Sequence, residues 1–192
     1  KNLIKKEDKI LLAGHNGMAG SAILRALKKR GYRNTIYFGR DQLDLEDFRQ
    51  VDTLIRNEKP DVIILAAAKV GGIMANYNYP ADFILRNLKI QTNLIECAWI
   101  YKVKRFLFLG SSCIYPKLSK QPIKEEYLLD GNLEKTNEYY AVAKIAGIKL
   151  CHALNKQYGF DAICLMPTNL YGPGDNYNLE TAHVLPALIK KF

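Results

Sequence analysis

The sequence is poor in cysteine and lacks long apolar runs. It contains four cysteines in 192 residues, and no two of them form a C-x-x-C pair. Neither a metal site nor a dithiol redox centre is therefore expected, and reduced thiols are typical of a cytoplasmic protein. No apolar run approaches the ~18 residues that span a membrane, and the run near the N-terminus is too short for a signal peptide. We therefore predict a soluble, cytoplasmic protein without a metal ion.

Acidic residues are fewer than basic ones. The 28 Lys and Arg against 19 Asp and Glu give a formal net charge of +9. Such a balance is compatible with nucleic acid, an anionic membrane or an anionic small molecule. The basic residues are scattered, however, and the cluster 28–30 falls where cations complement the end of a predicted helix. No alternation of aromatic and basic residues suggests base stacking, so no nucleic-acid partner is expected.

Short apolar runs alternate with longer helical patterns along the chain. The predicted strands are 10–13, 35–38, 61–65, 105–109 and 161–165, and the predicted helices are 18–30, 46–57, 80–101 and 137–158. Alternating strands and helices predict parallel βαβ units, and thus an α/β fold with a doubly wound parallel sheet of Rossmann type. The apolar strands suit a sheet buried on both faces, and ligands of such sheets bind beyond the carboxyl ends of the strands.

A glycine-rich turn follows the first predicted strand. Its position between a strand and a helix is the context of a dinucleotide-binding fingerprint, although a turn packed for purely structural reasons is the alternative. Gly14 permits a tight turn, Gly17 lets the backbone approach a pyrophosphate, and Gly20 lets the helix pack against the sheet. The free N–H groups of the helix then meet the anion. The predicted cofactor-binding turn comprises Gly14, His15, Asn16, Gly17, Met18, Ala19 and Gly20.

The residues after the second strand bear on the choice of dinucleotide. An acidic side chain at this point is typical of NAD sites, whereas an arginine accommodates the 2′-phosphate of NADP. The sequence has Arg40 directly after Gly39, which favours NADP(H) as the cofactor because a guanidinium binds phosphate oxygens in a fork. Asp41 leaves NAD as the alternative, since its carboxylate could turn inward.

A catalytic set lies between the fourth strand and the helix at 137–158. Tyr140 and Lys144 are four residues apart, so they share a helix face and the ammonium can lower the pKa of the phenol. Ser111 and Ser112 follow the fourth strand, where a hydroxyl can donate to a substrate carbonyl. Alternation along an extended segment points the two serines in opposite directions. We choose Ser111 rather than Ser112 as the hydroxyl that donates to the substrate carbonyl. Together, Ser111, Tyr140 and Lys144 predict a site for hydride transfer.

These motifs resemble the extended short-chain dehydrogenase/reductase superfamily and, within it, the GDP-sugar 3,5-epimerase/4-reductases. The resemblance covers nearly the whole chain. The segments that carry it are GHNGMAGSA at 14–22, LAAAKVGGI at 65–73, YPADFILRN at 79–87, FLGSSCIYPK at 108–117, YAVAKIAGIKL at 140–150, MPTNLYGP at 166–173 and HVLPALIKKF at 183–192.

The resemblance implies two reactions in one site, epimerisation of a 4-keto nucleotide-sugar and reduction of its ketone with NADPH. It implies that Cys113 is the epimerisation base, that His183 is the acid, and that Lys191 contacts the nucleotide-sugar. Asn16 departs from the arginine that relatives often carry, so NADP selectivity rests more on Arg40. The further residues that the resemblance places at the cofactor are Leu45, Leu109, Gly110, Ser112, Pro167, Thr168, Asn169, Leu170 and His183.

The resemblance also divides the chain. Residues 8–170 are expected to form the NADP-binding domain, and 171–192 the start of a substrate-binding region that is mostly missing, because family members continue further. The chain also begins without Met and stops inside a predicted helix. It is therefore expected to bind NADPH but to turn over poorly. The helices at 80–101 and 137–158 resemble those that form a homodimer.

Alternative functions remain open. A nucleotide-sugar 4-epimerase or 4,6-dehydratase is the nearest, although dehydratases typically carry Thr-Asp-Glu where this chain has Ser111-Ser112-Cys113. A non-catalytic dinucleotide-binding module is the other alternative, but it would not need the complete Ser-Tyr-Lys set.

Overall fold

The fold is a parallel sheet with helices around it. The structure is a computed structural model, which describes residues 4–178 and 181–192. Five strands pair in parallel in the order β2-β1-β3-β4-β5. They are β1 (Ile10–Ala13), β2 (Thr35–Ile36), β3 (Val62–Leu65), β4 (Arg105–Leu109) and β5 (Ala162–Leu165). The strand order changes direction between β1 and β3, which confirms the predicted doubly wound α/β fold and puts the switch point there.

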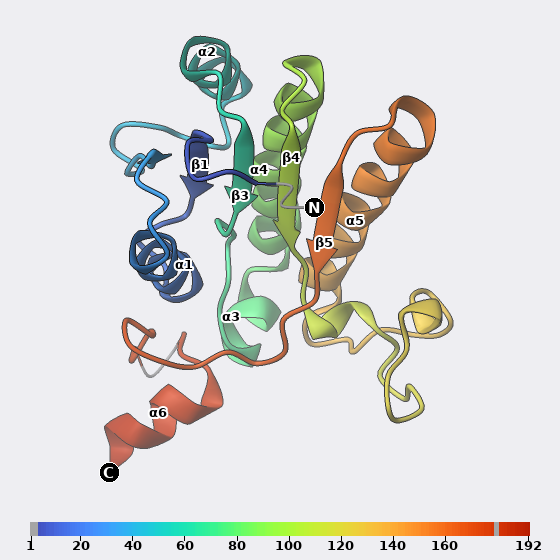
Figure 1. Cartoon of the computed structure of the whole chain (residues 1–192). Helices are drawn as coiled ribbons and strands as arrows, with labels where there is room; N and C mark the ends of the chain where they lie inside the picture. The colour runs from blue at the N-terminus through green and yellow to red at the C-terminus, as the bar shows by residue number, and fades with distance from the viewer. Residues whose placement is uncertain (1–3, 179–180) are drawn as a thin grey trace.

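The helices divide between the two faces and one end of the sheet. They are α1 (Met18–Lys29), α2 (Phe48–Glu58), α3 (Ile73–Asn78), α4 (Pro80–Ile100), α5 (Glu138–Tyr158) and α6 (Val184–Lys191), with 3₁₀ turns at Ser112–Ile114 and Glu125–Tyr127. In Figure 1, α4 and α5 lie behind the sheet and α1 lies in front of it. The strands point down towards α3 and α6, so these two helices lie beyond their carboxyl ends.

Alternating strand residues build two apolar clusters, one on each face. Leu11, Ile63 and Phe106 join the larger cluster, which includes residues of α4 and α5, whereas Leu12 and Ile64 join the smaller cluster with α1. All residues of β1 and β3 are buried, but β4 alternates and β5 is partly exposed. The prediction of a sheet buried on both faces is therefore wrong for β4 and β5. Among the described residues, the helix in the smaller cluster is α1, and its apolar side chains meet β1 and β3.

Several predicted elements differ from the structure by one or two residues at an end, and one helix was missed. The second strand was expected over 35–38 but ends at Ile36, because β2 is an edge strand that pairs only with Ile10 and Leu11 of β1. The short helix α3 was not predicted, since it buries Ala75 and Asn76 and exposes most of its apolar side chains. Its six residues are too few to show a helical periodicity.

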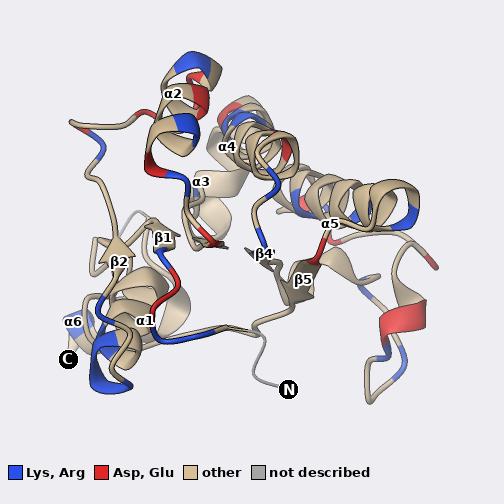
Figure 2. Cartoon of the chain, turned by 45° about the horizontal axis from the view of Figure 1, so that its top comes forward, with Lys and Arg blue, Asp and Glu red and all other residues tan. Residues whose placement is uncertain are grey.

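The distribution of basic residues and the hydropathy of the helices indicate which partners the surface could bind. Figure 2 shows Lys and Arg distributed over α1, α2, α5 and several loops rather than gathered on one face. Lys28 and Lys29 lie in the last turn of α1, as the dipole interpretation of that cluster requires. In the described part of the chain, no helix is both long and apolar enough to cross a membrane.

Candidate active site

A cavity of about 610 Å³ opens beyond the carboxyl ends of the strands. Loops after all five strands contribute to its wall, together with residues of α4 and α5. The predicted residues that line it are Gly14, His15, Asn16, Gly17, Met18, Ala19, Arg40, Leu45, Leu109, Gly110, Ser111, Tyr140, Lys144, Pro167, Thr168, Asn169, Leu170 and His183. Five predicted residues in the described chain lie outside this lining, namely Gly20, Asp41, Ser112, Cys113 and Lys191.

The glycine turn packs so closely that side chains would not fit at two positions. Gly14 has a φ of +92°, and a Cβ there would lie 2.5 Å from the backbone nitrogen of Ala67. A Cβ on Gly20 would overlap the carbonyl oxygen of Gly14, so α1 can approach the turn only because Gly20 has no side chain. At Gly17 the nearest atom to such a Cβ is 3.5 Å away, which leaves space beside the start of α1.

The N-terminus of α1 faces that space without a side-chain cap. Gly17 is the N-cap residue, and within the described part of the chain no side-chain cap bonds to the first-turn amides. Uncapped amides and the positive end of the helix dipole favour an anion. The Nδ1 atom of His15 is also buried without a partner among the described residues. A dinucleotide pyrophosphate therefore fits the turn.

Alanine at Gly20 and alanine at Gly17 should separate packing from binding. Gly20→Ala is expected to lower stability by about 2–4 kcal/mol, because α1 must move away from the Gly14 carbonyl. The Tm of Gly17→Ala should lie within a few degrees of the wild-type Tm, and yet this variant should bind dinucleotide roughly ten-fold or more weakly. Thermal unfolding and NADPH titration measure the two effects. Equal losses of stability in both variants would contradict this assignment.

The loop after β2 places Arg40 and Asp41 differently. Arg40 lines the cavity, with its side chain 73% exposed, and its guanidinium lies 3.3 Å from Glu46 Oε1. The Asp41 carboxylate folds back over Gly39, where a Cβ would overlap its Oδ1 atom. Gly39 therefore makes room for the carboxylate. Of these two charged residues, only Arg40 therefore lines the cavity, and its positive charge suits a 2′-phosphate.

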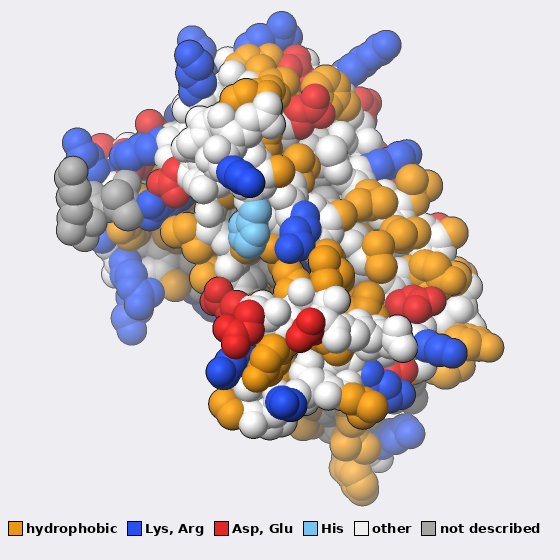
Figure 3. Space-filling view, turned by 90° about the vertical axis from the view of Figure 1, so that its right-hand side faces the viewer, with side chains coloured by type: hydrophobic (Ala, Val, Ile, Leu, Met, Phe, Trp, Pro, Cys, Tyr) orange, Lys and Arg blue, Asp and Glu red, His pale blue; other side chains and the backbone are white. Residues whose placement is uncertain are grey.

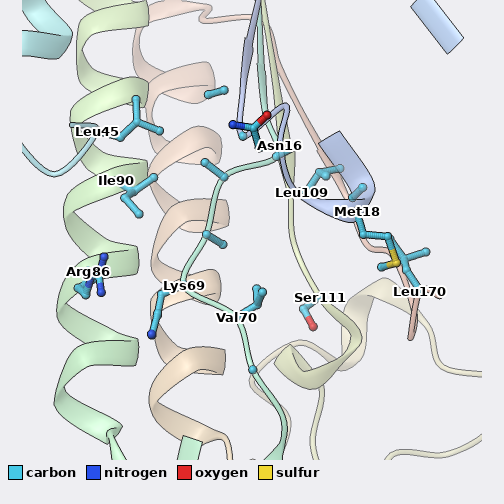
Figure 4. A pocket seen from close by; sticks show the side chains of 18 of the residues that line it. Asn16, Met18, Leu45, Lys69, Val70, Arg86, Ile90, Leu109, Ser111 and Leu170 are labelled. Carbon is cyan, nitrogen blue, oxygen red and sulfur yellow. The ribbon is translucent and has the colours of Figure 1, made fainter. Parts of the chain in front are cut away.

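Ser111, Tyr140 and Lys144 meet at one wall of the cavity. Ser111 follows β4 and lines the cavity, whereas Ser112 begins the 3₁₀ turn and lies outside the lining. Tyr140 and Lys144 lie on α5, one turn apart. Figure 4 shows the Ser111 hydroxyl beside the loop that follows β4. The structure thus brings together the three side chains that the sequence predicts for proton transfer.

Burial dominates the electrostatics of this set. It raises the pKa of the Tyr140 phenol well above its ordinary value, and the Cys113 thiol raises it further, while a hydrogen bond with Ser111 lowers it. Burial lowers the pKa of Lys144 to about 8. The Lys144 ammonium donates to the Leu109 carbonyl at 2.8 Å and lies 5.8 Å from the centroid of the Tyr140 ring. The sequence predicted that Lys144 lowers the pKa of the Tyr140 phenol, but the structure gives a raised pKa, because burial dominates and the group that lowers it is Ser111.

Of the three residues that the resemblance assigns to epimerisation and substrate binding, His183 lines the cavity, whereas Cys113 and Lys191 do not. The Cys113 amide donates to Ser111 Oγ at 3.5 Å, and burial raises the pKa of its thiol although Ser111 and Lys144 lower it. His183 lines the cavity just before α6. The Gly72 amide donates to the Thr181 carbonyl at 2.9 Å, which ties the segment before His183 to the loop after β3. Lys191 is exposed in the last turn of α6.

Several polar residues of this region were not predicted from the sequence. Asn87 is buried on α4, and its amide both accepts from the Lys69 nitrogen and donates to the Lys69 carbonyl at 2.9 Å. Gln91 donates to the Ala143 carbonyl at 2.5 Å and so joins α4 to α5. A polar residue on the apolar stripe of a long helix is a signal for such a contact. Arg86 and Glu46 also line the cavity.

The residues present fit a dinucleotide. The uncapped start of α1 suits the pyrophosphate, Arg40 suits a 2′-phosphate, and Ser111 and Tyr140 line the same cavity. Among residues 4–178 and 181–192, no group of three or more His, Cys, Asp or Glu side chains is arranged to hold a metal ion.

A doubly wound sheet with a glycine turn and a Ser-Tyr-Lys set defines a dinucleotide-binding domain of the short-chain dehydrogenase/reductase type. Residues 10–192 match the NAD dependent epimerase/dehydratase family, and the chain belongs to this family.

Named relatives are similar over nearly all of the chain. It is 57% identical to "GDP-L-fucose synthase 1" of Arabidopsis thaliana over 97% of its length. It is 54% identical to "GDP-L-fucose synthase" of Escherichia coli K12, also over 97%. A solved GDP-mannoheptose C4 reductase of Campylobacter jejuni with NADP bound matches 98% of this chain with 41% identity and a TM-score of 0.91, over 56% of its own length. The chain spans 58% of the length of the two curated relatives.

Proposed function

We propose that the protein uses NADPH to convert GDP-4-keto-6-deoxy-D-mannose to GDP-L-fucose. The observation that carries the proposal is the meeting of Ser111, Tyr140 and Lys144 at one cavity with the glycine turn. The identity of 54–57% to proteins named GDP-L-fucose synthase supports the choice of substrate. When bound, NADPH supplies the hydride that reduces the C4 ketone.

In the reduction, the side chains act on the ketone oxygen. Ser111 donates a hydrogen bond to this oxygen, and Tyr140 transfers its proton there as negative charge develops. The raised pKa of Tyr140 keeps the phenol protonated until that moment. Lys144, held by the Leu109 carbonyl, places a positive charge near the phenolate that remains.

In the epimerisation, the Cys113 thiolate removes a proton from the carbon beside the ketone, which leaves an enolate, and protonated His183 donates a different, solvent-derived proton to the opposite face. Protons alpha to a ketone are acidic enough for a positioned thiolate. The nearby Ser111 and Lys144 favour that thiolate, which offsets part of the burial cost. His183 lines the cavity, whereas Cys113 lies outside its lining, with its amide bonded to Ser111 Oγ.

We also propose the division into a cofactor domain at 8–170 and the start of a substrate region at 171–192, in which Lys191 contacts the nucleotide-sugar. Residues 179–180 of that region lie outside the described residues. The cytoplasmic location, the absence of a nucleic-acid partner and the poor turnover of the chain by itself stay predictions.

A homodimer through α4 and α5 belongs to the same proposal. Apolar side chains are exposed on both helices, including Leu85 and Ile100 on α4 and Tyr139, Val142 and Tyr158 on α5. Trp99 stacks on Tyr158 with ring centroids 4.8 Å apart, which joins the two helices. Figure 3 shows hydrophobic side chains grouped on the α5 side of the molecule. Sedimentation velocity measures whether two copies associate.

Incubation with GDP-4-keto-6-deoxy-D-mannose and NADPH in deuterated water tests the function. The expected result is slow oxidation of NADPH, with GDP-L-fucose as the product and deuterium at its C3 and C5. Reduction without deuterium would favour a simple C4 reductase, like the named Campylobacter jejuni relative. Because the chain spans 58% of its curated relatives, NADPH binding is measured separately from turnover. If the protein neither binds NADPH nor forms the product, the proposal is contradicted.

Arg40→Ala tests the choice of cofactor. The variant is expected to bind NADPH at least about ten-fold more weakly than wild type, because a charge-assisted bond to the 2′-phosphate is lost. NADH, which has no such phosphate, should bind with nearly unchanged affinity. Titration of both dinucleotides checks this, and equal losses for both would remove Arg40 from the selectivity argument.

A further inference from the structure

Glu46 joins two arginines at the wall of the cavity. Its Oε1 atom accepts from Arg86 Nε at 2.8 Å and lies 3.3 Å from Arg40 Nη2. Arg86 belongs to α4 and Arg40 to the loop after β2, and all three residues line the cavity. One carboxylate therefore holds two guanidinium groups that come from distant parts of the chain.

The charge in this trio is not balanced. Two guanidinium groups against one carboxylate leave a net positive charge at the cavity wall. Within the described ranges, Arg86 uses only Nε in hydrogen bonds, so both of its Nη groups are without a protein partner. The Arg86 side chain is 23% exposed, against 73% for Arg40. A sheltered guanidinium with unused donors binds an anion more strongly than an exposed one.

The position of Arg86 places it on the dinucleotide side of the cavity. Arg86 and Ile90 project from the same face of α4, and Figure 4 shows them on the side of Leu45, which the resemblance assigns to the cofactor. Asn16, on the glycine turn, brings no charge to the site. A phosphate on this wall would therefore meet guanidinium groups from two directions.

We propose that Arg86 is a second phosphate-binding residue of the dinucleotide site, and that Glu46 is a positioning residue that aligns Arg86 with Arg40. This inference rests on the proposed cofactor. The phosphate is either the 2′-phosphate or the pyrophosphate, since both are phosphate oxygens that a guanidinium binds in a fork. Glu46 does not contact the phosphate. It holds the two guanidinium groups in place before the anion arrives.

Binding of NADPH and NADH to Arg86→Gln tests the assignment. The variant should bind NADPH roughly ten-fold or more weakly than wild type. An unchanged affinity for NADH assigns Arg86 to the 2′-phosphate, and an equal loss assigns it to the pyrophosphate. Arg33→Gln removes the same charge from an exposed position outside the cavity lining and should bind both dinucleotides like wild type.

The double variant Glu46→Gln/Arg86→Gln separates binding from ion pairing. If Arg86 binds phosphate, the double variant stays at least about five-fold weaker for NADPH than Glu46→Gln alone. If Arg86 serves only to neutralise Glu46, the double variant returns to wild-type affinity, and the inference is overturned. Wild-type affinity in Arg86→Gln would overturn it too. A wild-type protein that binds neither dinucleotide would instead contradict the proposed function.

Discussion

Replacing Tyr140 with Phe is expected to lower the rate of C4 reduction roughly a thousand-fold, while NADPH binds within about three-fold of wild type. The phenol is the proton donor to the ketone oxygen, and such general acid catalysis contributes about 10²–10⁴-fold. The change removes one oxygen and leaves the ring that packs edge-on against Phe83. Single-turnover NADPH oxidation measures the rate, and NADPH titration measures the binding.

Tyr139→Phe is the matched control for this experiment. Tyr139 is the neighbouring residue on α5, is 45% exposed and lies outside the cavity lining, so its variant should react like wild type. The epimerisation gives a second readout, because it does not use the phenol. Tyr140→Phe should still incorporate deuterium at C3 and C5, whereas Cys113→Ser should not. Retention of a tenth of the reduction rate in Tyr140→Phe would argue against its role as the proton donor.

Replacing Lys144 with Met is expected to lower reduction at least about a hundred-fold and yet stabilise the fold at pH 7. Burial lowers the pKa of Lys144 from 10.5 to about 8, so the folded protein carries a buried charge at neutral pH at a cost of roughly 3 kcal/mol. Loss of the bond to the Leu109 carbonyl offsets about 1–3 kcal/mol of that gain. The net gain should be about 1 kcal/mol, or roughly 2–4 °C in Tm.

The pH dependence identifies the cause of this stabilisation. Between about pH 8 and 10.5, the unfolded chain binds a proton at Lys144 that the folded chain does not, so the stability of the wild type rises with pH in this window. The Met variant lacks this rise, and its advantage should therefore shrink from pH 8 upwards. Thermal unfolding between pH 7 and pH 10 measures the difference.

Lys149→Met provides the control, since Lys149 lies exposed on the same helix. It should show neither the gain in Tm nor the loss of activity. A Lys144→Met protein whose Tm difference from wild type is constant across this pH range would show that the buried ammonium carries no such cost.

Most of the architecture could be predicted because its signals are local. The strand β1, the glycine turn and α1 follow one another within residues 10–29, and each has a pattern that can be recognised without its neighbours. Tyr140 and Lys144 share a face for the same reason, since the helical repeat alone brings residues four apart together. The order of these elements was enough to predict a doubly wound sheet.

Contacts between distant segments could not be predicted in this way. The length of β2 depends on its pairing, which reaches only Ile10 and Leu11 although β1 continues to Ala13. The exposure of β5 depends on its place at the end of the strand order. The burial of Lys144 and Tyr140 likewise comes from the packing of α5 against the sheet and α4. This burial reverses the expected effect on the phenol pKa.

The class of fold, the glycine turn and the residue types available for proton transfer follow from the sequence alone. Which of these residues meet depends on the tertiary fold. It turned Ser111 and Arg40 to the cavity and Asp41 back over Gly39, and it brought Glu46 to Arg86 across 40 residues of chain. The physical reason is that backbone periodicity acts over a few residues, whereas burial and ion pairing depend on how whole helices pack against the sheet.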